Sequence, residues 1–219
     1  MAEFRIAVLA SGAGSNLQAL IGAISEGRLD ARIVGVFSDK PNCLALQRAR
    51  DAGIAAVARS PKDFASREGF DAALFAAVDA ARPDLIVCAG YMRIIAAAEI
   101  AARADRMINL HPSLLPAFKG LHTHRRALEA GAVEHGASVH VVTADLDDGP
   151  VLAQARVPVL AGDDEVALAA RVRAVEHPLL VETVRLLAEG RLRLQAGRIF
   201  LNGTPLAAPL QLGANRRLA

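Results

Sequence analysis

Short apolar runs alternate with helical patterns through the first half of the chain. The runs predict strands at Arg5–Ala10, Arg32–Phe37, Ile54–Val57, Leu85–Ala89 and Met107–Leu110. The intervening segments predict helices at Ser15–Ser25, Cys43–Ala52, Asp63–Ala81 and Ala96–Ala104, with Asp63 as an N-cap. Strands that are apolar on both faces and alternate with helices are typical of parallel sheets. We therefore expect an α/β fold with an open, mostly parallel, doubly wound (Rossmann-like) sheet and helices on both faces.

The second half of the chain has a different pattern. Ala137–Thr143 and Val151–Val159 alternate apolar and polar residues with period two, which is typical of half-buried strands. A long helical pattern follows, from an N-cap at Asp163 or Asp164 to Ala188. The fold is therefore expected to carry antiparallel additions in its C-terminal part.

The end of the chain holds weaker signals. Pro178 lies inside the long helical pattern and predicts a kink. Arg191–Leu194 and Ile199–Leu201, on either side of Gly197, predict a small hairpin. Residues 202–219 are rich in Gly, Pro and Ala, and we expect them to be loose.

Composition and charge narrow the class of protein. The chain has 219 residues, of which 53% are hydrophobic, so it is expected to fold rather than remain disordered. A formal net charge of +2 argues against a nucleic-acid partner that is bound through bulk charge. The N-terminus lacks the pattern of a signal peptide, and the most apolar stretch, Leu85–Met92, is too short for a membrane helix. We expect a cytoplasmic protein with no membrane partner.

A glycine-rich loop, Ser11-Gly12-Ala13-Gly14-Ser15-Asn16, follows the first predicted strand and opens the first helix. Glycines let the backbone approach a ligand closely, and a helix N-terminus favours a phosphate. The loop is neither the dinucleotide fingerprint, because position 17 is Leu, nor a Walker loop. A tight turn with Ser15 as a simple N-cap is the alternative interpretation.

Polar groups gather after the fifth predicted strand, where the ligands of open sheets bind. Asn109 and His111 are two residues apart, so in a strand both face the same side and can polarise one carbonyl group. An aspartate near His111, for instance in the turn Asp145–Pro150, would raise the pKa of the imidazole. The alternatives are a buried polar pair and an ordinary exposed turn.

Two further groups have competing interpretations. His122 and His124, with other histidines elsewhere, raise the question of zinc, but histidines two apart on a loop more often form hydrogen bonds or cap a helix. The two cysteines form no C-x-x-C pair, so we expect no metal site. The segment Tyr91–Ile95 is either a flat apolar pocket for a ring system or ordinary core.

Together these segments resemble a known family. SGxGSN, AGYMRII, NLHPSLLPAFKGLHTHRRALEAG and GASVHVVTADLDDGPVLAQ occur in the order and spacing of the phosphoribosylglycinamide formyltransferases, a folate-dependent family of purine synthesis. The resemblance runs from about Arg5 to about Gly197. It implies one formyltransferase domain over 1–201, with a phosphate-binding half at 1–110 and a folate-binding, catalytic half at 111–201. It also implies formyl transfer from 10-formyltetrahydrofolate, the co-substrate, to the amine of glycinamide ribonucleotide, without a metal.

The resemblance also implies roles for individual residues. The catalytic set is Asn109, His111 and Asp147. Ribonucleotide binding falls to Gly14, Ser15, Asn16 and Glu176. Folate binding falls to Arg67, Met92, Arg93, Ile94, Ile95, Asn109, Thr143, Asp145 and Asp147. Two positions depart from the family pattern: Asp148 stands where a small residue is expected, and Ala13 stands where some relatives carry a polar residue.

Three rival functions remain open from the sequence. Formyltetrahydrofolate deformylase uses the same donor but usually has an extra N-terminal domain, which we do not expect because the first strand begins at Arg5. Methionyl-tRNA formyltransferase adds a basic C-terminal domain, which the remaining chain is too short to form. A non-catalytic nucleotide-binding module would keep the glycine loop without needing Asn109, His111 and Asp147. The partners are expected to be small molecules, with the chain a monomer or a homodimer.

Overall fold

The computed structural model describes residues 3–219, which divide into two compact units. The first unit ends at Asn109, and the second is Leu110–Ala219. Among the described residues no helix is both long enough and apolar enough to cross a lipid bilayer.

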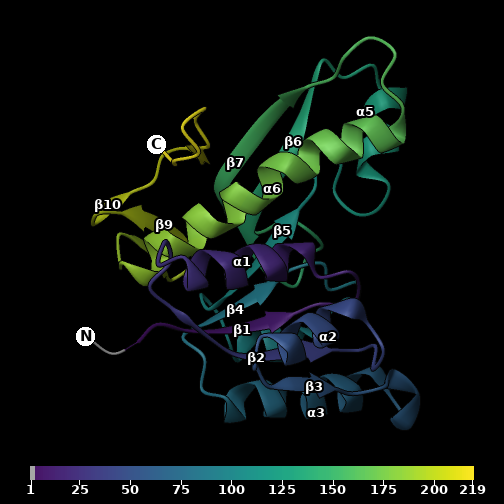
Figure 1. The fold of residues 1–219 in the computed structure, drawn as a ribbon, viewed down its shortest axis with the longest axis vertical. Coiled ribbons are helices and arrows are strands. Elements are labelled where there is room, and N and C mark those ends of the chain that lie inside the picture. Colours follow the sequence, from purple (N-terminus) through teal and green to yellow (C-terminus); the bar gives the residue numbers. More distant parts are fainter. Residues whose placement is uncertain (1–2) are drawn as a thin grey trace. The chain divides into compact units, whose positions relative to one another are not determined.

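Five parallel strands form the centre of the first unit, in the order β5-β4-β1-β2-β3 (Figure 1). Their bounds are β1 (Arg5–Leu9), β2 (Arg32–Ser38), β3 (Ala56–Ala58), β4 (Leu85–Cys88) and β5 (Met107–His111), of which β5 ends two residues into the second unit. β4 is buried along its whole length and β1 along all but its first residue. Strands of this kind need cover on both faces of the sheet.

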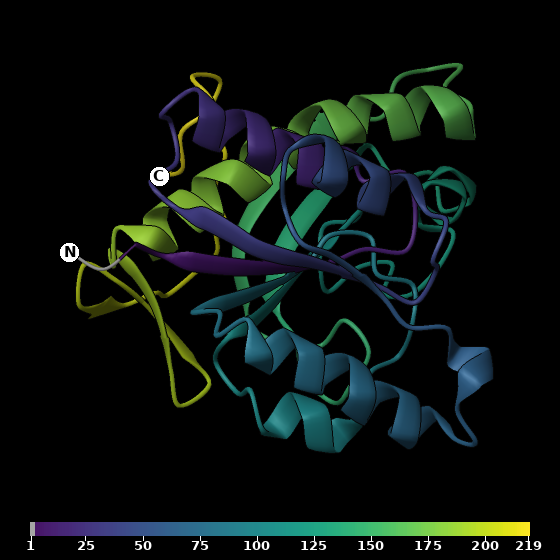
Figure 2. The same cartoon turned by 60° about the horizontal axis from the view of Figure 1, so that its bottom comes forward.

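Helices provide that cover on each side. Figure 2 shows α1 (Ser15–Ser25) and α2 (Leu44–Asp51) above the strands of this unit and α3 (Arg67–Ala80) with α4 (Ala97–Ala101) below them. A short 3₁₀ turn, η1 (Pro61–Asp63), precedes α3. The prediction of a parallel sheet with helices on both faces is confirmed.

The second unit contains the predicted antiparallel additions. β6 (Glu134–Val141) pairs antiparallel with β7 (Val151–Pro158), and β11 (Leu210–Gln211) lies parallel to β7. The long helix α6 (Glu165–Ala188) packs on β6 and β7 (Figure 1). A smaller antiparallel sheet is formed by β8 (Leu192–Gln195), β9 (Arg198–Leu201) and β10 (Thr204–Pro205), and a short helix, α5 (Thr123–Glu129), precedes β6.

Capping explains where the long helices begin. Asp164 accepts a hydrogen bond from the Ala167 amide and is the N-cap of α6, one of the two predicted choices. The prediction of Asp63 as the N-cap of α3 is wrong, because Asp63 ends the 3₁₀ turn. The Ser66 hydroxyl instead accepts from the Gly69 amide, so α3 begins at Arg67. α6 continues through Pro178, and the kink there stays a prediction.

The C-terminal residues are more ordered than their composition suggests. Residues 202–219 were expected to be loose, but Thr204–Pro205 pairs with β9 and Leu210–Gln211 pairs with β7. The Gln211 amide also donates to the Ala219 carbonyl at 2.9 Å. Backbone pairing with strands far away in sequence holds this segment, and local composition does not reveal such pairing.

Candidate functional site

The glycine-rich loop of the first unit joins β1 to α1. Gly14 is the N-cap residue of α1 and has a left-handed backbone with φ of 71°. A Cβ at this position would lie 2.8 Å from the Ala45 Cα, so both conformation and space require glycine. Ser15, the alternative N-cap, is instead the first helical residue, and the N-cap residue Gly14 forms no side-chain cap. The first turn of α1 therefore keeps the features that favour an anion.

Helix α2 holds this loop from behind. The Ala45 amide donates to the Gly12 carbonyl at 3.0 Å. Arg48 donates through Nε to the Ala13 carbonyl at 2.9 Å and through a second nitrogen to Gln18 at 2.9 Å. The contact at Ala13 is made by its backbone, so the departure from the family pattern at this position leaves the contact in place.

The loop after β4 contains the segment for which the sequence left a ring-binding pocket or ordinary core open. Met92 and Ile94 are exposed, at 68% and 59%, although both side chains are apolar, whereas Ile95 is buried. The Arg93 guanidinium stacks over the Phe70 ring at 4.9 Å from its centroid. Exposed apolar side chains at the carboxyl end of a parallel strand suit a flat ring better than they suit a core.

The predicted folate-binding residue Arg67 is at the N-terminus of α3. It forms an exposed ion pair with Glu68 at 3.4 Å. Burial raises the pKa of the Asp71 carboxyl, and the charges of Arg93 and Arg67 act to lower it. Arg67 and Arg93 therefore both lie near Asp71 in this unit.

In the second unit, His111 and Asp147 lie side by side. The distance from His111 Nδ1 to Asp147 Oδ2 is 3.3 Å, and both side chains are largely buried. His111 Nε2 lies 3.1 Å from the Phe118 carbonyl oxygen. The Gly120 amide donates to Asp147 Oδ2 at 2.9 Å. The loop 118–120 thus contacts both members of the pair.

His140 completes this arrangement. Its Nε2 lies 3.5 Å from Asp147 Oδ1, and its Nδ1 donates to the Val141 carbonyl at 2.9 Å. The Asp147 carboxylate is therefore placed between two imidazoles, each of which contacts a backbone carbonyl through its other nitrogen. Sequence reasoning considered His140 only as a metal ligand and missed this role. Its position on a predicted strand, followed by the Asp-rich turn, was the available signal.

Burial controls the charge of this group. It lowers the pKa of His111 below the ordinary value and outweighs the Phe118 carbonyl and the Asp147 carboxylate, which both act to raise it. The expectation that the pKa of His111 is raised is therefore wrong in net direction. For Asp147, burial acts to raise the pKa, but the hydrogen bonds from His140 and Gly120 and the charge of the imidazoles outweigh it, and the pKa is lowered. Near neutral pH, His111 is mostly uncharged beside an ionised Asp147.

The structure separates the two adjacent aspartates of the turn. Asp147 faces the histidines from a left-handed backbone with φ of 49°. Asp148 points to Lys119 and forms an ion pair with it at 2.5 Å. Gly149 follows where a Cβ would lie 1.9 Å from the Val141 carbonyl oxygen, so only glycine fits. The spacing argument that chose Asp147 over Asp148 agrees with these contacts.

The remaining predicted residues of the second unit lie on two elements. The Thr143 hydroxyl donates to the Asp145 carbonyl at 3.2 Å, which ties the folate-binding candidates of the turn to each other. Glu176 is on α6, next to His177. It acts to raise the pKa of His177, although burial lowers that pKa overall.

A second histidine pair lies apart from Asp147. His135 Nε2 and His124 Nδ1 are 3.2 Å apart, a distance that suits a hydrogen bond in which the N–H of one neutral ring donates to the unprotonated nitrogen of the other. Burial, followed by the charges of His124 and His111, lowers the pKa of His135 to about 4. No group of three His, Cys, Asp or Glu residues within 3–219 is arranged to hold a metal ion.

Folding stability is expected to fall in acid because of His135. Below pH 6.5 His135 is protonated in the unfolded chain, but in the folded chain it becomes protonated only near pH 4. The contribution of His135 to the free energy of unfolding is therefore complete above pH 6.5. It is lost as the pH falls from 6.5 to about 4, by up to roughly 3 kcal/mol. Urea denaturation at neutral pH and near pH 4.5 measures the loss. His135→Gln should reduce it, and an equal loss in this variant would contradict the assignment.

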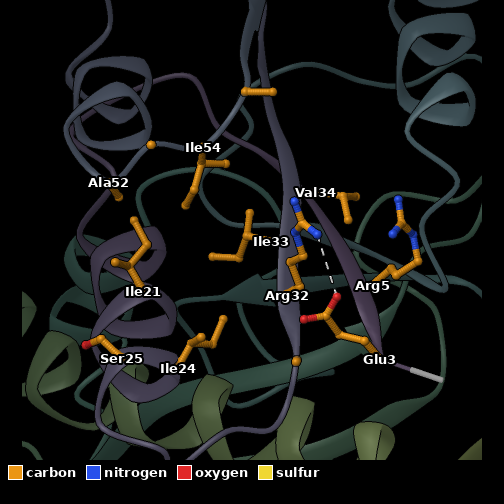
Figure 3. Close-up of a pocket in the computed structure, with 13 residues that line it drawn as sticks. Glu3, Arg5, Ile21, Ile24, Ser25, Arg32, Ile33, Val34, Ala52 and Ile54 are labelled. Atoms are coloured by element: carbon orange, nitrogen blue, oxygen red, sulfur yellow. Dashed lines mark ion pairs between the residues drawn. The ribbon is translucent and has the colours of Figure 1, made fainter. Parts of the chain in front are cut away.

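A cavity of about 600 Å³ lies elsewhere in the first unit (Figure 3). Arg5 and Arg32, the first residues of β1 and β2, place it at the amino ends of those strands. Ile21 and Ile24 of α1 form part of its wall, and an ion pair of 3.8 Å joins Arg32 to Glu3. The glycine-rich loop follows the opposite, carboxyl end of β1, so this cavity contains none of the predicted site residues.

Comparison with known proteins gives the family of the chain. Residues 4–184 match the formyl transferase family. The chain is 47% identical over 201 residues to the phosphoribosylglycinamide formyltransferase of Escherichia coli (strain K12), which covers 92% of this chain and 95% of that relative. The structure of the phosphoribosylglycinamide formyltransferase from Coxiella burnetii superposes with a TM-score of 0.90 at 45% identity, covering 94% of this chain and 96% of that one.

A deformylase is a more distant relative. The formyltetrahydrofolate deformylase from Pseudomonas syringae pv. tomato matches with a TM-score of 0.82 at 27% identity. That match covers 91% of this chain but 66% of the deformylase. The chain belongs to the formyl transferase family, and its more similar relatives there are phosphoribosylglycinamide formyltransferases.

Proposed function

We propose that this protein transfers the formyl group of 10-formyltetrahydrofolate to the amine of glycinamide ribonucleotide, a step of purine biosynthesis. The observation that carries the proposal is the buried His111–Asp147 pair in a chain so similar to phosphoribosylglycinamide formyltransferases over nearly its whole length. We further propose that the protein acts in the cytoplasm on small molecules, as a monomer or a homodimer.

The folate supplies an activated formyl group, and the residues of the chain act on the charge that develops there. Attack by the amine turns the formyl oxygen into an oxyanion. Asn109 and His111, two residues apart in β5, supply the N–H donors for this oxygen. On His111 this donor is the Nε2–H that forms when the imidazole takes up the proton of the attacking amine, because Nδ1 faces Asp147. Each donor of this kind is worth roughly 3–4 kcal/mol in the transition state.

A proton must also pass from the attacking amine to the departing folate nitrogen. Burial lowers the pKa of His111, and its Nδ1 faces the Asp147 carboxylate, so the uncharged imidazole can accept this proton at Nε2. The adjacent Asp147 carboxylate then stabilises the imidazolium. His111 returns the proton as the bond between the formyl carbon and the folate nitrogen breaks, so no proton is gained or lost overall.

The binding roles follow the two loops of the first unit and the elements of the second. We assign the ribonucleotide to Gly14, Ser15, Asn16 and Glu176. We assign the folate to Arg67, Met92, Arg93, Ile94, Ile95, Asn109, Thr143, Asp145 and Asp147. The first turn of α1, whose N-cap is a glycine, supports the binding of the ribonucleotide phosphate there, and the exposed apolar side chains of Met92 and Ile94 support the binding of the folate ring system.

A folate absorbance assay on the purified protein tests the proposal. We expect 10-formyltetrahydrofolate to be consumed only when glycinamide ribonucleotide is present, with a chelator in every sample. Consumption without the ribonucleotide would instead assign the deformylase reaction. No consumption in either sample would overturn both and leave a phosphate-binding module.

A further inference from the structure

Three loops of the first unit meet at the side chain of Ser11. Its Oγ donates to Asp39 Oδ1 at 2.5 Å and accepts from the Met92 amide at 3.0 Å. Its own amide donates to the Gly90 carbonyl at 3.0 Å. Ser11 and Asp39 are 3% and 7% exposed, so water competes little for these bonds. The residue joins the loop after β1 to the loops after β2 and β4.

The direction of these hydrogen bonds is fixed by chemistry. A serine hydroxyl has one proton, and a carboxylate oxygen can only accept it. Because the hydroxyl proton is donated to Asp39, the lone pairs of the hydroxyl oxygen are left to accept from the Met92 amide. A bond to a charged partner is also stronger than one between neutral groups. The position of the Met92 amide is therefore set by Asp39 through the Ser11 hydroxyl.

The Asp39 loop is itself held by a buried side chain. The Ser38 hydroxyl, which is fully buried, accepts from the Lys40 amide at 3.0 Å and contacts Cys43 Sγ at 3.2 Å. Cys43 is the N-cap residue of α2, the helix that holds the carbonyls of Gly12 and Ala13. The contacts of Ser38 therefore hold the Asp39 loop in place, and the other two loops can be aligned on it.

We infer that Ser11 is a positioning residue that aligns the glycine-rich loop, assigned to the ribonucleotide, with the 91–95 loop, assigned to the folate, through its hydrogen bonds to Asp39 and Met92. The inference rests on the proposed function, which assigns these two loops to the two substrates. It predicts that one hydroxyl, which contacts neither reacting group, controls the binding of both substrates. The backbone bond from Ser11 to Gly90 does not involve the hydroxyl, so the fold is expected to survive its loss.

Steady-state kinetics of Ser11→Ala test the inference. We expect KM to rise about tenfold for both glycinamide ribonucleotide and the folate, because a buried hydrogen-bonded group loses its partner. We expect kcat to change by less than about threefold, since His111 and Asp147 belong to other elements. Ser25→Ala is the matched control, because its hydroxyl only bonds the Gly22 carbonyl on the surface of α1.

Asp39 variants separate alignment from a general structural effect. Asp39→Asn keeps an acceptor for the Ser11 hydroxyl and should remain within about threefold of the wild-type KM values. Asp39→Ala should reproduce Ser11→Ala, and the double variant should be no worse than either single one, because both remove the same link. Additive effects, a change in only one KM, or a loss confined to kcat would overturn the inference.

The assay also keeps the inference apart from the proposed function. If the wild-type protein does not turn over with the ribonucleotide, the proposed function fails, and the inference that rests on it fails too. If the wild type is active and Ser11→Ala matches it in both KM values, the inference alone fails. Thermal unfolding of each variant checks that its fold is retained, and Asp39→Ala, which removes the same link, replaces Ser11→Ala in the test if Ser11→Ala does not fold.

Discussion

His111→Ala is expected to reduce kcat by about a thousandfold or more. The change removes an oxyanion donor, worth a factor of 10²–10³, and a proton-transfer group, worth a further 10²–10⁴, and such effects overlap rather than multiply. Substrate binding should survive, because His111 is not among the residues assigned to bind the ribonucleotide or the folate. Single-turnover kinetics measure the loss, and equilibrium titration with each substrate checks binding.

A second variant divides the two roles of this histidine. His111→Gln keeps an N–H donor but cannot take up a proton. If the donor role dominates, the glutamine variant recovers part of the lost rate, and if proton transfer dominates, it is as slow as the alanine variant. A kcat within about tenfold of wild type in the alanine variant would contradict the assignment of His111.

The fold of the first unit could be predicted because its signals are local. Apolar runs, a glycine-rich loop and an amphipathic period predicted α1 at Ser15–Ser25, the bounds that the structure has. Where two residues offered the same signal, the sequence could not choose between them. Asp63 and Ser66 are both good N-caps, and only the structure shows that Ser66 caps α3. The C-terminal residues adopt a regular structure because they pair with β7 and β9, and no local sequence pattern reveals this pairing.

The candidate site could be predicted in its residue types but not in its contacts. The family resemblance named His111 and Asp147, yet their separation along the chain hides the 3.3 Å contact. His140 was missed because its role depends on the turn that follows β6. The pKa of His111 was predicted in the wrong direction because the sequence shows a possible carboxylate partner but not the depth of burial. Burial results from packing of the whole unit.

Asp147→Asn is expected to reduce kcat by about a hundredfold or more, by analogy with other histidines that lose an orienting carboxylate. Asparagine keeps the shape of the side chain and an acceptor for the Gly120 amide, but it removes the charge that lies between the two imidazoles. The imidazolium that forms at His111 during proton transfer then has no adjacent anion. The loss should appear in kcat more than in either KM.

The pH profile gives this prediction a second, independent readout. The Asp147 carboxylate acts to raise the pKa of His111, so removing it should lower that pKa further below the ordinary value. If the uncharged imidazole takes up the proton, activity rises as His111 loses its proton, and this acid limb lies below pH 6.5 in the wild type. The limb should move to still lower pH in Asp147→Asn. An unchanged limb would mean that another group governs it.

Asp148→Asn is the matched control for this argument, because the two carboxylates are adjacent and only one faces the histidines. Asp148 forms a largely exposed ion pair with Lys119, and exposed pairs contribute at most about 1 kcal/mol. Its loss should leave kcat within about twofold and the acid limb in place. If Asp148→Asn were the damaging variant and Asp147→Asn the mild one, the assignment of the two neighbours would be reversed. Since both variants remove one negative charge from the same turn, a difference between them measures position and not net charge.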